Sequence, residues 1–447
     1  MAKVFMSVLG TNKYVEAKYV VDGKPSPLTP FVQEAFLSVT KDEWKSDDRI
    51  VIFLTDGARK KNWESGCYSY RGLRERLEKL ELSSRILAIP FRDGKDEAEI
   101  MENFLTIVNQ IQEEDEIIFD ITHSFRSLPM LVLVALVYAS TLKNAKIKKI
   151  YYGAFEVLGP PKYVEENIPP EQRKAPVFDL TVYANLVNWA FAVDEFSQYG
   201  MASRLSELML SELIPVLRRT KGRNERARSL RKLTDYIKSL TVNIYTCRCI
   251  EIEETNLDPD ILALDSKDFI PAFAPLADKI RKKVERFSGK DSWLKAMFAV
   301  EWCIEHNMIQ QGYTILQEAT ISEVGRLFGV KGVCMNKSER EFISSLLSVI
   351  GQNKSVEHWE GKLKKEKEKA LSWIDIGGEH LKELAKSFAS LSQIRNDINH
   401  CGCRKDYMES KNILKRLEEK YQEISKRMQL LRQQLSETRG QGDEGTD

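Results

Sequence analysis

An arginine and a histidine near the C-terminal end of the chain have residue types and a spacing that could cleave RNA. Arg395 and His400 lie five positions apart, and Asn396 directly follows the arginine. Arginine carries a permanent charge on a planar group that suits phosphate, and histidine can give and take a proton near neutral pH. The two suffice to cleave RNA without a metal if a 2′-hydroxyl of the substrate is the nucleophile. The alternative is a solvated helix face that carries both residues without using them.

The spacing of this pair favours an active site built from two chains. Five positions along a helix turn through about 140°, so Arg395 and His400 do not lie on one helix face. Two such helices that meet at a symmetry axis would place two arginines and two histidines around one cleft. Because twofold homodimers are the commonest oligomers, we expect a homodimer or a higher homo-oligomer.

The N-terminal part of the chain alternates apolar runs of strand length with helical stretches. The runs begin at Val4, Ile50, Arg85, Glu116 and Lys146, helices are expected near residues 31–41, 63–82, 97–112 and 127–142, and a last strand is expected at 177–181. This alternation predicts βαβ units and therefore an α/β domain whose parallel sheet is covered on both faces. In such sheets ligands bind outside the carboxyl ends of the strands.

Polar turns follow three of these strands and would meet on that edge of the sheet. They consist of Gly10, Thr11 and Asn12, of Thr55, Asp56 and Gly57, and of Thr122, His123, Ser124, Phe125 and Arg126. The helix after the third turn would offer free N–H groups to a phosphate. Arg126 could add a bidentate contact, and His123 could donate to a phosphate or a base. The turns are candidate ligand-binding residues, and the alternative is that their side chains only satisfy the backbone.

Other kinds of site are not expected. No G-x-G-x-x-G follows the first strand and no G-x-x-x-x-G-K-[ST] occurs, which argues against a nicotinamide cofactor and a P-loop. The seven cysteines are odd in number and scattered, unlike a disulfide framework. Cys247 and Cys249, like Cys401 and Cys403, form C-x-C pairs and not the C-x-x-C of zinc ribbons, so no metal is expected. Gly402 marks the expected end of the helix that carries Arg395 and His400.

The order and spacing of these features resemble the CRISPR-associated auxiliary ribonucleases of type III systems. These proteins join an N-terminal CARF sensor domain to a C-terminal HEPN nuclease domain. The resemblance rests on the first strand and turn with the following residues 31–35, on residues 120–129, and on residues 395–400, which match the HEPN pattern of Arg, four residues, then His. Residues 307–319 also resemble the first long HEPN helix, which packs against the helix that carries the catalytic pair.

The resemblance implies an activity and a role for each residue. Members bind cyclic oligoadenylate made by a type III effector complex, and binding switches on cleavage of single-stranded RNA in antiviral defence. It implies that the three turns bind the activator, expected to be cyclic tetra-adenylate, in a pocket shared by two CARF domains. In a composite HEPN site, His400 would transfer protons, Arg395 would stabilise charge on the phosphate, and Asn396 would help to orient it. No metal or other cofactor and no stable association with the effector complex would be needed.

The resemblance and the residue pattern together suggest a domain map. Residues 1–182 would form the Rossmann-like CARF domain, 183–285 a helical connector, 286–438 the α-helical HEPN domain, and 439–447 a disordered, glycine-rich tail. The connector contains a basic stretch, residues 218–232, with eight basic residues and one acid. This stretch could contact RNA phosphates or be a solvated loop and helix start, and it lacks the interleaved aromatic residues that stack bases.

Composition agrees with a cytoplasmic enzyme, and two other functional classes stay open. No signal peptide is recognisable, and the longest apolar stretch, residues 128–139, is too short to cross a membrane. A net charge of +1 means that any RNA site is local. One alternative is a CARF-type transcription regulator that reads DNA through the connector, with no role for His400. The other is an unregulated HEPN ribonuclease toxin in which the turns at Gly10, Gly57 and His123 are only structural.

Overall fold

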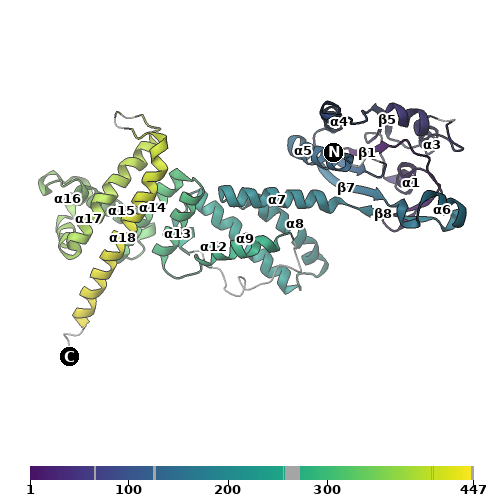
Figure 1. The fold of residues 1–447 in the computed structure, drawn as a ribbon. Coiled ribbons are helices and arrows are strands. Elements are labelled where there is room, and N and C mark those ends of the chain that lie inside the picture. Colours follow the sequence, from purple (N-terminus) through teal and green to yellow (C-terminus); the bar gives the residue numbers. More distant parts are fainter. Residues whose placement is uncertain are drawn as a thin grey trace. The chain divides into compact units, whose positions relative to one another are not determined.

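The chain folds into two compact units, residues 1–188 and 189–447. The computed structural model describes residues 1–64, 67–123, 127–254, 256, 272–403, 405 and 407–443 (Figure 1). Ser124, Phe125 and Arg126 of the third predicted turn therefore lie outside the described residues. The division after residue 188 falls close to the predicted end of the sensor domain at 182, and the further predicted border at 285 stays a prediction.

The N-terminal unit is built on one eight-stranded sheet with the order β3-β2-β8-β7-β6-β1-β4-β5. The strands are β1 (Lys3–Leu9), β2 (Lys18–Val21), β3 (Lys24–Pro25), β4 (Arg49–Leu54), β5 (Arg85–Pro90), β6 (Glu116–Asp120), β7 (Lys146–Gly153) and β8 (Lys174–Asp179). Strands β5, β4, β1, β6 and β7 are mutually parallel, which confirms the predicted parallel core. Because β4 and β6 flank β1 on opposite sides, the chain direction across the sheet reverses at β1, where such folds form a ligand crevice.

The central strands are buried on both faces because helices cover both sides of the sheet. Val4 and Met6 of β1 pack with helices α4 (Glu97–Asn109) and α5 (Leu128–Lys143). Phe5, between them in sequence, packs on the opposite face with α1 (Val32–Val39) and α3 (Leu73–Glu78). Alternate side chains of a strand point to opposite faces, so a continuous apolar run is required here. Full burial of such a side chain contributes about 1.5–3 kcal/mol to the stability of the folded state.

Two details of this unit differ from the sequence-based expectation. Strands β2 and β3 were not expected, and β8 pairs antiparallel with β7 and parallel with β2. The helical stretch expected near 63–82 is confirmed only in part: α3 covers Leu73–Glu78, while a short α2 (Asp56–Ala58) and a π-helical turn η2 (Arg59–Trp63) come before it. A Cβ at Gly72 would lie 2.4 Å from the carbonyl oxygen of Trp63. The chain folds back on itself at that point, which a continuous helix could not do.

The C-terminal unit is entirely helical in its described part. Its helices are α7 (Thr181–Tyr199, which crosses the division), α8 (Ser203–Arg219), α9 (Glu225–Tyr245), α10 (Cys249–Glu254), α12 (Ala274–Glu285), α13 (Ser292–Glu305), α14 (Ile309–Leu327), α15 (Lys337–Gly351), α16 (Gly361–Lys365), α17 (Lys367–Asn399) and α18 (Ser410–Asp443). One hydrophobic core runs from Trp189 to Leu435. The helices of the predicted connector therefore share a core with those of the predicted nuclease.

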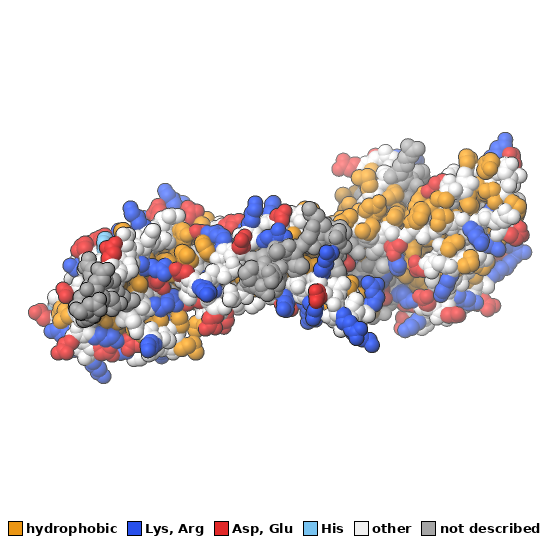
Figure 2. Space-filling view, turned by 90° about the horizontal axis from the view of Figure 1, so that it is seen from below, with side chains coloured by type: hydrophobic (Ala, Val, Ile, Leu, Met, Phe, Trp, Pro, Cys, Tyr) orange, Lys and Arg blue, Asp and Glu red, His pale blue; other side chains and the backbone are white. Residues whose placement is uncertain are grey.

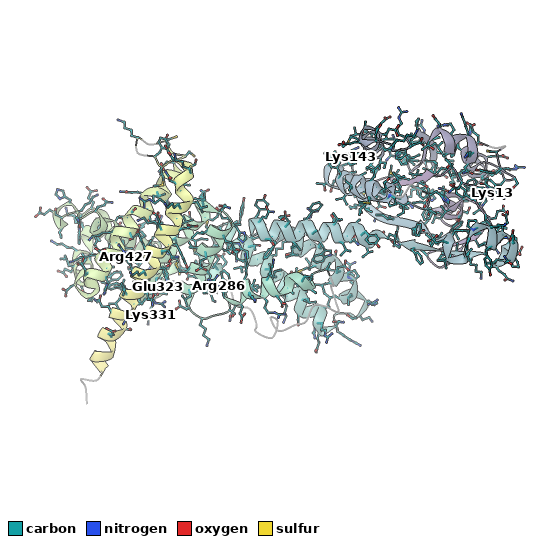
Figure 3. All side chains as sticks on the ribbon, viewed as in Figure 1. Lys13, Lys143, Arg286, Glu323, Lys331 and Arg427 are labelled. Atoms are coloured by element: carbon teal, nitrogen blue, oxygen red, sulfur yellow. The ribbon has the colours of Figure 1, made fainter. Side chains whose placement is uncertain are left out.

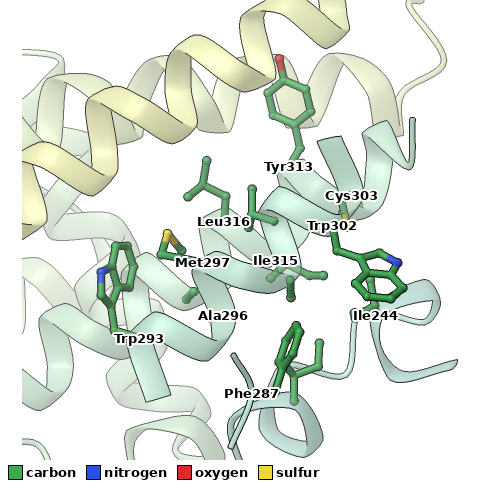
Figure 4. Packing of buried hydrophobic residues seen from close by; sticks show 14 of the residues in the cluster. Ile244, Phe287, Trp293, Ala296, Met297, Trp302, Cys303, Tyr313, Ile315 and Leu316 are labelled. Carbon is green, nitrogen blue, oxygen red and sulfur yellow. The ribbon is translucent and has the colours of Figure 1, made fainter. Parts of the chain in front are cut away.

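Helix α14 lies at the centre of this core. Met297 of α13 packs against Ile315 and Leu316 of α14, as Figure 4 shows. A Cβ at Gly312 would lie 2.6 Å from Leu417 Cδ2, so a glycine there lets α18 approach α14 closely. Helix α14 also contacts α17, the helix that carries Arg395. This is the packing that the resemblance implied for residues 307–319.

Charged side chains tie α18 to its neighbours. Arg427 of α18 reaches the carboxylate of Glu383 in α17 at 3.3 Å, and Arg432 reaches Glu323 of α14 at 3.1 Å. Figure 3 labels Arg427 and Glu323. The apolar stripe of α18 packs on its own unit, as its spacing suggested, since Leu417 and Ile424 are fully buried. Helix α18 runs to Asp443, and the disordered tail expected over residues 439–447 stays a prediction. Residues 444–447 lie outside the described part, and within it no helix is long and apolar enough to span a membrane.

Candidate functional site

The structure brings the three predicted turns together at the carboxyl edge of the sheet. A Cβ added at Gly10, after β1, would lie 3.4 Å from His123 Cβ, after β6. A Cβ added at Gly57, after β4, would lie 3.1 Å from Thr11 Cγ2. The turn after β1 is therefore in contact range of both others, and the predicted proximity of these residues is confirmed. Their role in binding a ligand is a separate question, because no contact inside the protein tests it.

A buried asparagine that the sequence did not single out holds the first turn in place. The Asn62 side chain is fully buried and its Nδ2 donates to the carbonyl oxygens of Gly10 and Asn12, at 2.9 Å each. Its Oδ1 accepts a 2.9 Å hydrogen bond from the Tyr70 hydroxyl, which in turn accepts from the Tyr14 N–H at 3.1 Å. Nothing in the sequence pairs residues this far apart, so no local signal could have found this network.

Replacing Asn62 by alanine should destabilise the N-terminal unit by about 2–4 kcal/mol. The change leaves two carbonyl groups and one hydroxyl without the amide, and each buried group left unsatisfied costs about 1–3 kcal/mol. Urea unfolding followed by circular dichroism would measure the loss. Asn109→Ala, at the exposed end of α4, is the matched control and should stay within about 0.5 kcal/mol of the wild type. Equal effects of the two changes would contradict the network.

Two aromatic rings at the same edge have polar atoms left free. The rings of Tyr14 and His123 stack with centroids 4.0 Å apart. The Tyr14 hydroxyl and His123 Nε2 are both buried and have no hydrogen-bond partner among the described residues. Burial lowers the pKa of His123 to about 3, so the imidazole is neutral near pH 7. The pair can thus offer a ligand an aromatic face and uncharged polar atoms, but no cation.

The hydroxyls of two predicted ligand-binding residues already have structural partners. Thr122 Oγ1 donates to the Asp120 carboxylate at 2.5 Å and accepts from the Gly153 N–H at 2.7 Å. Thr55 Oγ1 caps α2 by accepting from the Ala58 N–H at 3.2 Å. Asp120 is buried and also accepts from Ser7 Oγ at 2.7 Å, and burial raises the pKa of its carboxyl. The hydroxyls of Thr122 and Thr55 therefore help to shape this edge of the sheet, and the role of the two residues in binding a ligand stays a prediction.

A cavity of about 430 Å³ opens beside the third turn. It is lined by Thr122, His123, Tyr152, Gly153, Phe155, Glu156, Gly159, Pro160 and Pro161. Of these, Tyr152 and Glu156 are joined by a 2.6 Å hydrogen bond from the tyrosine hydroxyl. The sequence indicated the first two lining residues and missed the others, because Tyr152 and Gly153 end β7 and the rest belong to the connection after it, which has no recognisable motif. The cavity extends the candidate ligand site across β6 and β7.

In the C-terminal unit, the predicted catalytic residues lie at an open helix end. Helix α17 ends at Asn399, with His400 as its C-cap. Cys401 and Gly402 follow with φ of +57° and +68°, and the Gly402 N–H donates to the Asp397 carbonyl at 3.0 Å. This left-handed ending is the helix stop that Gly402 predicted. His400 and Asn396 are exposed, so both can reach a partner outside the helix.

A neighbouring asparagine holds the Arg395 guanidinium. With the Asn399 amide turned so that its oxygen faces the arginine, that oxygen accepts from Nε at 3.1 Å and Nη1 at 3.2 Å. Amide orientation is assigned from such hydrogen bonds. Arg395 is half-buried, and its charge acts to lower the pKa of the Cys247 thiol, against the larger opposing effect of burial. The end of α9 therefore lies near Arg395, although sequence reasoning did not connect the two.

The cysteine pairs bring no metal cluster together in the described part of the chain. No group of three or more histidine, cysteine or acidic side chains with the geometry to hold a metal ion is found there. Cys401 and Cys403 are exposed, and burial raises the pKa of Cys249 to about 12. A protonated thiol is a poor ligand and a poor nucleophile.

Comparisons with known proteins point to the family of the N-terminal unit. Residues 4–156 match the CARF domain of the CRISPR system endoribonuclease Csx1. The CRISPR-associated protein MJ1674 of Methanocaldococcus jannaschii is 28% identical over 252 residues, which is 55% of this chain and 35% of that protein, so the chain spans about a third of this curated relative. The structure of Enterococcus italicus Csm6 bound to cyclic hexa-2′-fluoro-hexa-dAMP covers 97% of this chain and 95% of its own, at 12% identity and a TM-score of 0.45. Residues 4–156, in the N-terminal unit, are thus similar to the CARF domain of Csx1.

Proposed function

We propose that this protein is a metal-independent endoribonuclease that cyclic oligoadenylate activates and that cuts single-stranded RNA in type III CRISPR defence. The observation that carries the proposal is a CARF domain in one chain with an arginine and histidine at an open helix end. Residues 4–156 are similar to the CARF domain of Csx1, and Arg395 and His400 lie in the separate helical unit. A sensor and a cleavage site in separate units of one chain fit a ligand-controlled nuclease.

The activator would bind at the carboxyl edge of the sheet. The turns at Gly10, Thr55 and Thr122, the Tyr14–His123 stack and the adjoining cavity supply backbone N–H groups, an aromatic face and uncharged polar atoms. Adenine rings stack on aromatic side chains, and phosphates bind to backbone N–H groups. We propose cyclic tetra-adenylate as the activator and two CARF domains as the walls of its pocket.

An exposed apolar surface on the N-terminal unit supports the homodimer. Helices α4 and α5 lie side by side, with the rings of Phe104 and Tyr138 5.3 Å apart. Large hydrophobic side chains on these helices are exposed, namely Ile100, Met101, Leu105, Met130, Val134, Tyr138 and Leu142. Figure 2 shows such side chains gathered on this unit. Contiguous apolar surface of this kind marks an interaction site in a water-soluble domain, and a second copy of the chain is the occupant we propose.

Cleavage would use the substrate's own 2′-hydroxyl. That oxygen attacks the adjacent phosphorus while His400 takes part in moving its proton, and the 5′-oxygen of the next nucleotide leaves with a proton. Arg395, held by Asn399, stabilises the charge on the phosphate oxygens, and Asn396 helps to orient the phosphate. The products are a 2′,3′-cyclic phosphate and a 5′-hydroxyl. The exposure of His400 suits a site completed by the second chain of a dimer.

Cleavage of a labelled single-stranded RNA in EDTA, with and without cyclic tetra- and hexa-adenylate, tests the proposal. We expect cutting that depends on one of the two rings, and no cutting of a matched DNA, which lacks the 2′-hydroxyl. Equal cleavage with and without activator would leave an unregulated ribonuclease. Binding of the activator without cleavage would favour a ligand-responsive regulator. Both outcomes contradict the proposal as stated.

A further inference from the structure

A dense group of positive side chains lies where helices α8 and α9 meet. The eight basic residues between positions 218 and 232 are all exposed, and they are Arg218, Arg219, Lys221, Arg223, Arg226, Arg228, Arg231 and Lys232. The chain turns between the two helices at Gly222, whose φ is +73°. Because the whole chain carries a net charge of only +1, this group is a strong local concentration of positive charge.

Part of this group lines a groove. The groove has a volume of about 690 Å³ and is lined by Ile214, Leu217, Arg218, Gly222, Arg228, Arg231, Lys232 and Asp235. Four of these side chains are positive and one is negative. Ile214 and Leu217 are half-buried and provide an aliphatic floor, and none of the described residues that line the groove is aromatic. We call this site, defined by these lining residues, the α8–α9 groove.

The positive side chains of the groove are weakly compensated by the protein itself. Arg228 lies 3.7 Å from Glu225 and Arg231 lies 3.7 Å from Asp235, and all four side chains are more than half exposed. Exposed pairs of this kind contribute about 0–1 kcal/mol. Arg218 and Lys232 have no ion pair among the residues that the structure describes. The groove therefore offers positive charge that an anion can bind without breaking strong contacts.

The positive groups form a row and not a single point. Arg228, Arg231, Lys232 and Asp235 have the spacing of one helix face, and Arg228 and Lys232 are separated by about 6 Å along the axis of α9. A single small anion would use only part of this row. A nucleic acid strand, which repeats one negative charge per nucleotide, matches a row of cations.

We propose that the α8–α9 groove binds the phosphodiester backbone of the single-stranded RNA that the enzyme cuts. The identity of this strand rests on the proposed function, whereas the anionic, repeating nature of the ligand rests on the groove. An aliphatic floor without aromatic rings indicates backbone contacts that do not depend on base sequence. The groove thus acts as a second RNA contact, separate from the cleavage site.

The position of the groove predicts a dependence on RNA length. Arg231 lies about 21 Å along α9 from Tyr245 at 1.5 Å per residue. Cys247 lies just beyond that end of α9, and the charge of Arg395 acts to lower the pKa of its thiol, so this end of the helix is near Arg395. Since a strand rises at least about 3.4 Å per nucleotide, about six nucleotides or fewer bridge such a distance. An RNA of about 20 nucleotides can therefore occupy both sites, whereas a dinucleotide, which has a single phosphodiester, cannot.

Binding is best tested on the full chain with His400→Ala, so that RNA stays intact. Fluorescence anisotropy with an oligouridylate of about 20 nucleotides would compare Arg228→Gln/Arg231→Gln/Lys232→Gln with Lys364→Gln/Lys365→Gln/Lys367→Gln. The second triple removes three exposed lysines from another part of the same unit. We expect the groove triple to weaken binding about tenfold or more and to reduce the salt-dependence slope by about 2, at about 0.7 per phosphate contact. The lysine triple should leave both unchanged.

Several results would overturn the inference. Equal losses in the two triples would show a general charge effect, and an unchanged slope in the groove triple would remove the groove from the RNA path. Tighter, groove-dependent binding of duplex DNA would assign the groove to another partner. In the active chain, the groove triple should raise KM for the long RNA and leave kcat/KM for the short one unchanged. If the wild type cuts no RNA, the proposed function fails while the binding assay still decides the role of the groove.

Discussion

Replacing His400 by alanine is expected to lower kcat for RNA cleavage by about 10²–10⁴-fold, the usual contribution of a positioned acid–base group. Alanine cannot move a proton, whereas the arginine and the binding surfaces remain. Because cleavage in our proposal needs no metal, the loss should be the same in EDTA and in Mg²⁺. Single-turnover cleavage at saturating activator measures the effect without interference from product release.

The same change should leave the fold intact. His400 is exposed, and its backbone N–H bond to the Asn396 carbonyl, 2.9 Å long, survives in alanine. The helix end is held by the left-handed Cys401 and Gly402, which do not depend on the imidazole. We therefore expect an unfolding midpoint within the scatter of the wild type. A melting curve on the same preparation separates loss of chemistry from loss of structure.

His358→Ala is the matched control for this experiment. His358 is also exposed and lies in the same unit, where its Nδ1 is 2.7 Å from the Ser355 hydroxyl. It should change kcat less than about twofold, as expected of a surface substitution away from the site. A large loss in His358→Ala, or full activity in His400→Ala, would remove the assignment of His400.

The parts of the fold that the sequence predicts well depend on patterns that local physics enforces. The runs around Phe5 and Ile50 are apolar on both faces, and only a sheet covered on both sides buries them. The ends of parallel strands share one edge, so the proximity of Gly10, Gly57 and His123 follows from the strand assignment alone. Gly402 predicted the end of α17 because only a left-handed residue closes a helix in that way.

What the sequence does not reveal depends on contacts between distant residues. Asn62 is separated from Gly10 by 52 positions, and no pattern distinguishes it from a surface asparagine. The 63–82 stretch has helical periodicity, but the close approach of Gly72 to Trp63 divides it. Strand β3 has two residues, too few for an apolar pattern of its own, and is held by pairing with β2. Tertiary contacts override local propensity in each case.

The second large effect concerns the stacked pair at the edge of the sheet. Gly10→Ala should lower the unfolding free energy of the N-terminal unit by about 1–3 kcal/mol, the cost of overpacking. The new Cβ would lie 2.6 Å from the Tyr14 hydroxyl oxygen. That ring cannot easily retreat, because it stacks on His123 at 4.0 Å and meets Phe31 edge-on at 5.7 Å. Urea unfolding measures the loss.

A compensating change makes the prediction sharp. Tyr14→Phe removes only the hydroxyl, which has no hydrogen-bond partner in the described structure, so alone it should be nearly neutral. In the double variant Gly10→Ala/Tyr14→Phe, the nearest remaining atom is His123 Cβ at 3.4 Å, an ordinary contact. We expect the double variant to recover most of the stability that Gly10→Ala loses. If the stability losses of the two single variants simply added in the double variant, this packing would be contradicted. The effects of two substitutions depend on each other mainly when the residues are in contact.

The same three variants test whether this edge binds the activator. An activator at about 100 times its Kd adds about 2.7 kcal/mol to the stability of a protein that binds it only when folded. If cyclic tetra-adenylate binds where Gly10 and His123 meet, this increment should shrink in Gly10→Ala, since the added Cβ disturbs the Tyr14–His123 stack that the proposed site uses. It should return in the double variant, where the stack is restored without the hydroxyl. If the activator stabilises all variants equally, the ligand does not bind at this edge of the sheet. If it does not stabilise even the wild type, cyclic tetra-adenylate is not the activator.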